Sequence, residues 1–413
     1  MGISEEDRQS MPPLEVRLPP LFRCPISLEV MRSPVSLCTG VTYDRSSIQR
    51  WLDSGHRTCP ATRLPLPSTD LVPNLTLRSL MHHWTSGSAS ADNLLLRLRR
   101  SPDPLPPLRD LADHLSADRS EVDRLASAGA PAIAPLLGSE SEAVVEAAVK
   151  VLALLLTADK IEEGSRENAV SALVADLDRS VSALFAVMSS GSGIQSRIDT
   201  ARVVESILAS SSCDPQSKIA IAEREELFPE LVKLIREEGS PAAAEAGIGC
   251  MATAVAAAGR RRARTWIVRS GAVAALAKAI AAEDTAALAA ERAMELMEVA
   301  TGCAEGREAI GGEAAAVVRA VMGKMTKVGR EGREAAVAVL WKVCCGGRGE
   351  GRVREAMAAE KGALGKLLVV MQEELSPEVG RMAGELLRII MAEMDGRDCL
   401  VGYNTKTTHI MPY

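Results

Sequence analysis

Four residues near the N-terminus carry the side chains best suited to hold a metal ion: Cys24, Cys38, His56 and Cys59. Two tetrahedral zinc sites need eight ligands, which are usually spaced as Cys-x2-Cys pairs. Residues 18–84 contain no such pair, so two zinc sites are excluded there, and one site built from all four residues is the minor alternative. No Ser-His-Asp set or pair of catalytic carboxylates can be argued from spacing either. The sequence therefore predicts no metal and no cofactor.

Cys24 and Cys59 also mark two loops, because each is followed by a proline that fixes one backbone torsion. In the first loop, Pro25 therefore holds the neighbouring Ile26 in a defined pose. An isoleucine in this place has little reason to be buried, so we expect it on the surface.

Three elements are predicted to position these loops. A Thr-Gly pair separates two short apolar runs, which predicts a β-hairpin over residues 35–43. The central helix is predicted over residues 45–52, with Asp44 as its N-cap and Gly55 as the residue that ends it. A last helix is predicted over residues 75–84.

The segment that contains these loops has a recognisable pattern. The run FRCPISLEVMRSPVSLCTGVTYDRSSIQRW, followed by TCPATRLPL and LVPNLTLRSLMHHW, resembles the U-box of the plant U-box/armadillo-repeat ubiquitin ligases. A U-box is similar to a RING finger without zinc. The resemblance implies a ligase (E3) that has no nucleophile and binds a conjugating enzyme (E2) charged with ubiquitin. Such a ligase acts by positioning, since it holds ubiquitin where a substrate lysine attacks.

The same resemblance implies roles for individual residues. Ile26 and Leu28 of the first loop, Trp51 of the helix and Pro60 of the second loop are expected to contact the E2. Arg63 is expected to bridge the E2 and ubiquitin, for which a planar guanidinium with several donors is suited. The alternatives are core packing for Trp51, simple loop packing for Leu28 and Pro60, and a structural ion pair for Arg63.

A module of this kind needs something other than zinc to hold its loops. In the family this is done by charged pairs, and Glu29, Asp44, Arg45 and Arg63 are the candidates in this sequence. The pairing itself cannot be read from the sequence. Loss of one partner of a buried pair typically costs about 3–5 kcal/mol, enough to unfold a small module.

The long region over residues 111–394 repeats a phrase in which a small residue pair, often Gly-Ala, precedes apolar residues at helical spacing. Copies begin at Gly129, Leu227, Gly271, Gly312 and Gly362. A spacing of about 40 residues is typical of armadillo or HEAT repeats, which must stack to bury their apolar stripes. The glycine of each phrase is expected to adopt a positive φ at a corner between helices. A solenoid is favoured over a generic helical bundle.

Composition divides the chain into five parts and makes its fold class mostly α. The predicted parts are a polar tail (1–17), the U-box (18–84), a Ser/Gly/Pro-rich linker (85–110), armadillo-like helical repeats (111–394) and a flexible C-terminal tail (395–413). Aromatic residues make up only 2% of the 413 residues, and the apolar residues are mainly helix formers.

Net charge and cysteine spacing restrict which partners and which cellular compartment the sequence predicts. The formal net charge of −6 gives no electrostatic case for nucleic acid. Nine irregularly spaced cysteines argue against a disulfide framework. No run of about 18 uncharged apolar residues is present, so no membrane span is predicted. The expected location is the cytoplasm, with the nucleus as an alternative.

The leading hypothesis is therefore an E3 ubiquitin ligase whose solenoid holds a protein substrate. The resemblance further implies stress or defence signalling in plants. Two other hypotheses are a non-catalytic armadillo scaffold and a zinc-dependent RING-like adaptor.

Overall fold

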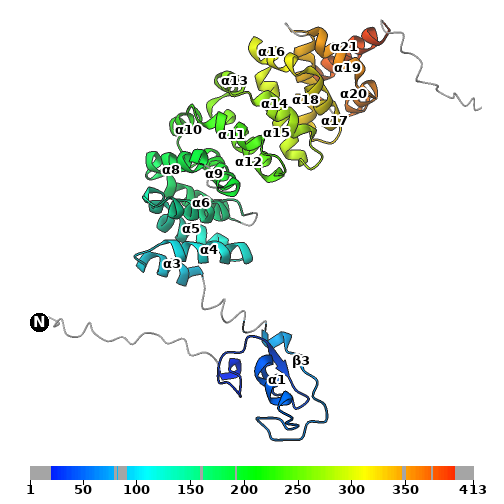
Figure 1. Cartoon of the computed structure of the whole chain (residues 1–413). Helices are drawn as coiled ribbons and strands as arrows, with labels where there is room; N and C mark the ends of the chain where they lie inside the picture. Colours follow the sequence, from blue (N-terminus) through cyan, green and yellow to red (C-terminus); the bar gives the residue numbers. More distant parts are fainter. Residues whose placement is uncertain are drawn as a thin grey trace, which may run out of the picture. The chain divides into compact units, whose positions relative to one another are not determined.

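The structure is a computed structural model, and it describes residues 20–78, 81, 91–158, 161–190, 193–346, 350–373 and 375–395. The predicted polar tail (1–17) lies outside these residues, as does the predicted C-terminal tail beyond its first residue, Asp395. The chain divides into two compact units, Met1–Leu96 and Arg97–Tyr413. Each unit is described by itself (Figure 1).

The N-terminal unit contains a three-stranded antiparallel sheet of strand order β2-β1-β3 and one central helix. Its elements are the 3-10 helix η2 (Pro20–Phe22), β1 (Pro34–Ser36), β2 (Thr42–Asp44), α1 (Arg45–Asp53) and β3 (Val72–Pro73). The sheet and the helix enclose a core that includes Phe22, Met31, Val35, Leu37, Tyr43, Ile48 and the two loop cysteines. We call the described residues 20–78 and 81 the N-terminal module.

Local sequence signals explain these elements. The predicted hairpin is confirmed, with Gly40 in its turn at φ 81°. Asp44 caps α1 as predicted, because its carboxylate accepts the N–H of Ser46. Gly55 follows the helix at φ 84°, a conformation that glycine adopts without steric cost. Of the predicted last helix, residues 75–78 are helical and most of the remainder lies outside the described residues.

The second unit is built from helices alone in its described residues. They are α4 (Leu105–Ala117), α5 (Val122–Ile133), η3 (Ala134–Gly138), α6 (Glu142–Leu156), α7 (Glu163–Val174), α8 (Leu177–Ser190), α9 (Ile194–Ala209), α10 (Pro215–Ala222), α11 (Leu227–Ile235), α12 (Pro241–Ala258), α13 (Arg260–Arg269), α14 (Ala272–Ala281), α15 (Ala287–Ala300), α16 (Ala304–Gly312), α17 (Ala314–Lys324), α18 (Arg330–Cys344), α19 (Glu350–Ala359), α20 (Ala363–Gln372) and α21 (Pro377–Asp395).

These helices form a repeat solenoid rather than a bundle. Along one layer, α4 packs on α6, α6 on α9, α9 on α12, α12 on α15, α15 on α18, and α18 on α21 (Figure 1). A second layer contains α8, α11, α14 and α17, each packed on the next. Each helix therefore buries its stripe against the neighbouring repeats. The predicted mostly α fold, a small module followed by an armadillo-type solenoid, is confirmed.

The glycines of the repeated phrase divide into two groups. Gly271 and Gly362 have φ values of 71° and 75° and precede α14 and α20, as predicted. At Gly129 the prediction of a corner is wrong, because α5 runs through this buried residue with its apolar stripe unbroken. At Gly312 the predicted corner is found, because α16 ends at this glycine and α17 begins at Ala314, but the predicted positive φ is wrong.

The predicted linker (85–110) is corrected in its second part. Helix α3 (Ala91–Arg100) occupies it, and α4 already begins at Leu105. The Ser/Gly/Pro signal flanks a short amphipathic run whose Leu94 and Leu98 are buried. The division between the two units falls within α3.

Helix α12 is long and apolar enough to span a membrane by length and composition, and no other helix among the described residues is. It packs against α9, α11 and α15, and 56% of it is buried within the protein. Its apolar character therefore matches that of a core helix.

Carboxylates bind the beginnings of helices in following repeats. Glu167 on α7 accepts the N–H groups of Ser211 and Ser212 before α10, at 2.9 and 2.7 Å. Glu334 on α18 accepts the N–H of Ser376 before α21 at 2.9 Å. The free N–H groups at a helix start favour such anions, so these contacts fix the offset between repeats.

Arginines bind the opposite ends of helices. Arg264 on α13 donates to the carbonyl of Gly302 after α15 at 3.2 Å. Arg307 on α16 donates to the carbonyl of Gly346 after α18 at 2.8 Å. A cation at a helix C-terminus satisfies unpaired carbonyls and offsets the helix dipole.

Glu167 gives a pH-dependent prediction. Burial alone would raise its pKa, but hydrogen bonds from Ser210, Ser211 and Ser212 outweigh burial and lower the pKa to about 2. Because this value lies below the ordinary 4.5, the stabilisation is complete above about pH 4.5 and is lost as the pH falls toward 2. We expect Glu167→Gln to lower the free energy of unfolding by about 2 kcal/mol at pH 7, and by less at pH 3.

Urea unfolding followed by far-UV circular dichroism at several pH values measures this difference. Glu163→Gln is the matched control, since Glu163 is exposed on the same helix and forms an ion pair with Arg166. It should change stability by less than about 0.5 kcal/mol. Equal effects of the two variants, or a Glu167 effect that does not shrink in acid, would contradict the assignment.

Candidate functional site

The two Cys-Pro loops share one backbone design. In the first, the N–H of Cys24 donates to the carbonyl of Glu29 and the N–H of Leu28 donates back to the carbonyl of Cys24, both at 2.8 Å. In the second, Cys59 N–H donates to Leu64 at 2.9 Å and Arg63 N–H donates to Cys59 at 2.8 Å. Residues at equal spacing from each cysteine therefore have equal roles.

The fifth residue of each loop adopts a left-handed backbone. Leu28 has φ 60° and Arg63 has φ 59°, and no other non-glycine residue in the described part of the chain has a positive φ. A side chain in this region costs on the order of 1–3 kcal/mol. The two loops therefore place a leucine and an arginine where a glycine would be unstrained.

Buried sulfur atoms organise both loops. Cys24 is fully buried, and its Sγ accepts the backbone N–H of Asp44 at 3.3 Å. The Sγ of Cys59 interacts with the Thr39 hydroxyl at 3.4 Å and the Tyr43 hydroxyl at 3.0 Å. Burial alone would raise the pKa of Cys59, but hydrogen bonds from Thr39, Thr62 and Tyr43 lower it to about 6. The thiols thus act as acceptors that anchor the loops.

Asp44 joins the first loop region to helix α1. One carboxylate oxygen accepts the N–H groups of Arg32 and Ser33 at 2.8 and 2.9 Å. The other accepts the hydroxyl of Ser46 at 2.6 Å and its N–H at 3.2 Å. Burial would raise the pKa of Asp44, but these hydrogen bonds hold it below its usual value.

The expected ion pairs are not what holds the module. No ion pair within 4.0 Å joins any of Glu29, Asp44, Arg45 and Arg63 to another residue of the described module. Arg45 uses its backbone N–H, which donates to Ser33, and Glu29 uses its backbone groups. The prediction of charged pairs is therefore wrong for this part of the chain. Hydrogen bonds to sulfur and to the Asp44 carboxylate take that place, while Glu29, Arg45 and Arg63 are exposed.

The residues predicted to contact a partner lie on the loops and beside them. Ile26 is 37% exposed and Leu28 is 69% exposed. Pro60 is half-buried, while Arg63 is exposed. Leu64, which the sequence analysis did not single out, is 57% exposed beside Arg63. Both loops therefore present apolar side chains to solvent.

Trp51 has a structural role as well as an exposed edge. Its ring packs on the module core and stacks on His56 at 4.0 Å. Its indole N–H donates to the carbonyl of Thr58 at 2.9 Å, directly before the second loop. This geometry supports the packing alternative for Trp51, which braces the loop against α1.

The alternative single zinc site is not assembled by this geometry. Cys38 donates to the carbonyl of Ser68, and His56 stacks on Trp51. Cys24 and Cys59 are engaged as described, and the four side chains do not converge on one point.

The acceptor roles of Cys24 and Cys59 and the role of Tyr43 were not predicted from the sequence. The signal that could have revealed the first is the internal match between CPISL and CPATR, with a hydroxyl residue three places after each cysteine. Tyr43 gave no such signal, because it reaches Cys59 across sixteen residues.

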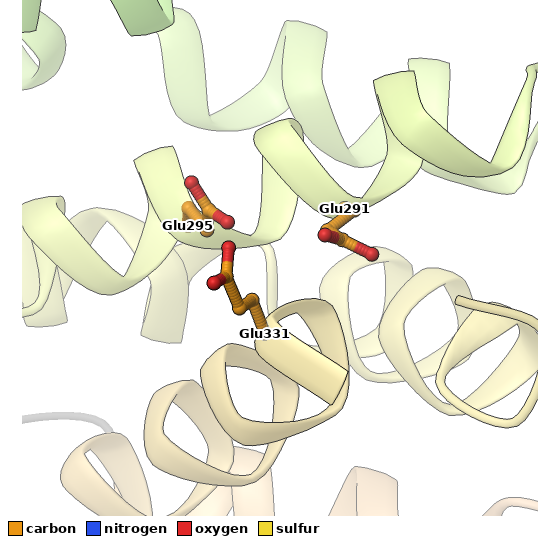
Figure 2. Close-up of side chains that lie close together, drawn as sticks. All are labelled: Glu291, Glu295 and Glu331. Atoms are coloured by element: carbon orange, nitrogen blue, oxygen red, sulfur yellow. The ribbon is translucent and has the colours of Figure 1, made fainter. Parts of the chain in front are cut away.

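A separate acidic cluster lies on the solenoid. Glu291 and Glu295 on α15 and Glu331 on α18 bring carboxylate oxygens within 4.8 Å of one another (Figure 2). Burial and repulsion from Glu331 and Glu291 raise the pKa of Glu295. Glu295 and Glu331 also line a pocket of about 400 Å³ with Glu298, Glu334 and Arg260. Acidic clusters of this kind are common on protein surfaces, so this one identifies no ligand.

Comparison with known families agrees with both units. Residues 18–89 match the U-box domain, and residues 111–410 match the plant U-box protein ARM repeat region. This chain belongs to the plant U-box proteins with an armadillo repeat region. The U-box match extends a few residues beyond the predicted boundary at residue 84.

Several plant U-box proteins are similar over nearly the whole chain. U-box domain-containing protein 28 of Arabidopsis thaliana is 33% identical over 96% of this chain and 98% of its own length. E3 ubiquitin-protein ligase PUB23 of Arabidopsis thaliana is 27% identical over 94% and 96%. U-box domain-containing protein 12 of Oryza sativa subsp. japonica is 58% identical over 67 residues, 16% of this chain and 11% of its own length.

The fold also occurs among solved structures. A structure from work on the interaction between cadherin and beta-catenin matches 74% of this chain and 55% of its own chain, with a TM-score of 0.53 and 15% sequence identity. This likeness concerns the solenoid fold alone.

The hydrogen bonds to the Asp44 carboxylate are expected to stabilise the U-box without a metal ion, and a substitution at Asp44 tests this. We expect Asp44→Ala to lower the opening free energy of the U-box by about 2 kcal/mol, because it removes a helix cap and leaves the N–H groups of Arg32 and Ser33 without their acceptor. Hydrogen exchange of the full-length protein, read by mass spectrometry over residues 20–78, measures this value. Asp53→Ala, at the other end of α1, should leave exchange nearly unchanged. Equal protection in wild type and Asp44→Ala would refute the assignment.

Proposed function

We propose that this chain is a U-box-type E3 ubiquitin ligase that binds a ubiquitin-charged E2 through its two matched loops. The observation that carries the proposal is the presence, in one small module, of exposed Ile26, Leu28 and Leu64 beside a left-handed Arg63. The U-box match and a relative named E3 ubiquitin-protein ligase support it. The two loop cysteines are buried, so their thiols serve the loops rather than accept ubiquitin.

The chemistry follows from what these side chains offer. Apolar side chains on two stiff loops provide a small contact surface, in which a few anchors carry most of the affinity. Arg63 adds several donors in one plane, and they suit acceptors on both the E2 and ubiquitin. Holding the charged E2 in one arrangement converts a flexible encounter into a positioned one, and a lysine amine then attacks the thioester.

The solenoid is proposed to hold the protein substrate. Its stacked helices form a long surface over α6, α9, α12, α15, α18 and α21, and arrays of this kind commonly bind partners along such surfaces. We also propose a role in plant stress or defence signalling and a location in the cytoplasm, with the nucleus as an alternative. Family resemblance supports the role, and the irregularly spaced cysteines support the location.

The activity is tested by incubating the full-length protein with activating enzyme, E2, ubiquitin and ATP. Wild type should form ubiquitin chains, whereas Ile26→Ala should weaken E2 binding by about thirtyfold, or about 2 kcal/mol, and lose chain formation. Binding is measured by titration with the E2.

Val72→Ala is the matched control, because Val72 is 62% exposed on β3 and lies outside both loops. It should leave both readouts unchanged. Wild-type protein that forms no chains with any of a panel of E2 enzymes would favour a non-catalytic scaffold. Normal chain synthesis by Ile26→Ala would refute the docking assignment.

A further inference from the structure

The hydroxyl of Tyr43 holds the second loop at two points. The Tyr43 side chain is fully buried, with 0% exposure. Its oxygen accepts the N–H of Ala61 at 3.1 Å, which leaves its proton free for the sulfur of Cys59 at 3.0 Å. Both partners are on the second loop, so a residue of strand β2 fixes the backbone on which Arg63 stands.

Arg63 depends on that backbone. Its guanidinium has no hydrogen bond or ion pair to the described residues, and its own N–H donates to the carbonyl of Cys59 at 2.8 Å. The left-handed φ of 59° persists only where surrounding contacts hold it. Within the described module, those contacts include the bonds of the Tyr43 hydroxyl to Cys59 and Ala61.

The first loop has no equivalent side chain. The sulfur of Cys24 receives the backbone N–H of Asp44, and no hydroxyl from the sheet reaches it in the described residues. Removing the Tyr43 hydroxyl therefore disturbs the loop of Arg63 and spares the loop of Ile26 and Leu28.

We propose that Tyr43 is a positioning residue for Arg63, one that sets the rate of ubiquitin transfer and leaves E2 affinity to the first loop. This inference rests on the proposed ligase function. The protonation properties of the pair agree with it. Burial and the hydrogen bond to Cys59 raise the pKa of Tyr43, so it stays a donor, whereas Cys59 has a pKa of about 6 and is a strong acceptor at neutral pH.

The test uses full-length Tyr43→Phe and single-turnover discharge of ubiquitin from a charged E2 to free lysine. The phenyl ring keeps the core filled, so the change removes the two hydrogen bonds alone. We expect the maximal discharge rate to fall about tenfold, with the half-saturating ligase concentration within about twofold of wild type. An unchanged rate, or a loss of affinity at least as large as the loss of rate, would overturn the inference.

A double-mutant cycle separates positioning from general weakening. If Tyr43 acts through Arg63, the Tyr43→Phe/Arg63→Ala double variant should discharge at about the rate of Arg63→Ala alone. A further tenfold loss in the double variant would mean that Tyr43 acts independently, and the inference would be wrong. The half-saturating concentration in each variant reports whether the first loop is still folded.

Two more variants complete the design. Cys59→Ala approaches the same contact from the loop and should reproduce the rate defect without adding to Tyr43→Phe. Ser36→Ala removes the hydrogen bonds of the Ser36 hydroxyl to Thr42, at 2.8 Å, and to the side-chain amide of Asn74, at 3.2 Å, and neither bond touches the second loop. It should leave the discharge rate unchanged, and a defect equal to that of Tyr43→Phe would overturn the inference. If the wild-type protein itself does not promote discharge of ubiquitin from the E2, the proposed ligase function is wrong, and the inference about Tyr43 fails with it.

Discussion

Hydrogen bonds to three buried or half-buried acceptors hold the loops of the N-terminal module in place. The acceptors are the sulfurs of Cys24 and Cys59 and the carboxylate of Asp44. A module this small buries too little apolar surface to hold irregular loops by packing alone. Each acceptor gathers donors from loop and sheet or helix, so the loops are fixed without ion pairs between charged side chains. This avoids the desolvation cost of buried ion pairs, which often equals their Coulombic gain.

The solenoid follows the same rule at its helix ends. Its repeats are related by contacts between a side chain of one helix and the backbone ends of another, as for Glu334 with Ser376 and Arg264 with Gly302. These contacts use groups that every helix leaves unpaired, so they can recur without a strict sequence motif.

The sequence predicted the features that depend on local chemistry. The cap at Asp44, the turn at Gly40 and the corner at Gly271 need only a few neighbouring residues, and all three are found. What failed depends on distant contacts. The pattern of charges suggested ion pairs, but which side chain meets which acceptor is decided by the fold, as Tyr43 with Cys59 illustrates. The predicted corner at Gly129 is absent because the apolar residues on both sides of it are buried on one continuous face of α5.

The location of backbone strain argues for where this chain acts. Glycine at the positions of Leu28 and Arg63 would relax a left-handed backbone that costs each residue on the order of 1–3 kcal/mol. Neither side chain repays this cost inside the module, since both are exposed and neither packs in the core. Backbone strain that no internal side-chain contact offsets argues that these two residues serve an external contact. The two strained residues stand at matching places on the two loops, so each loop offers one such residue for an external contact.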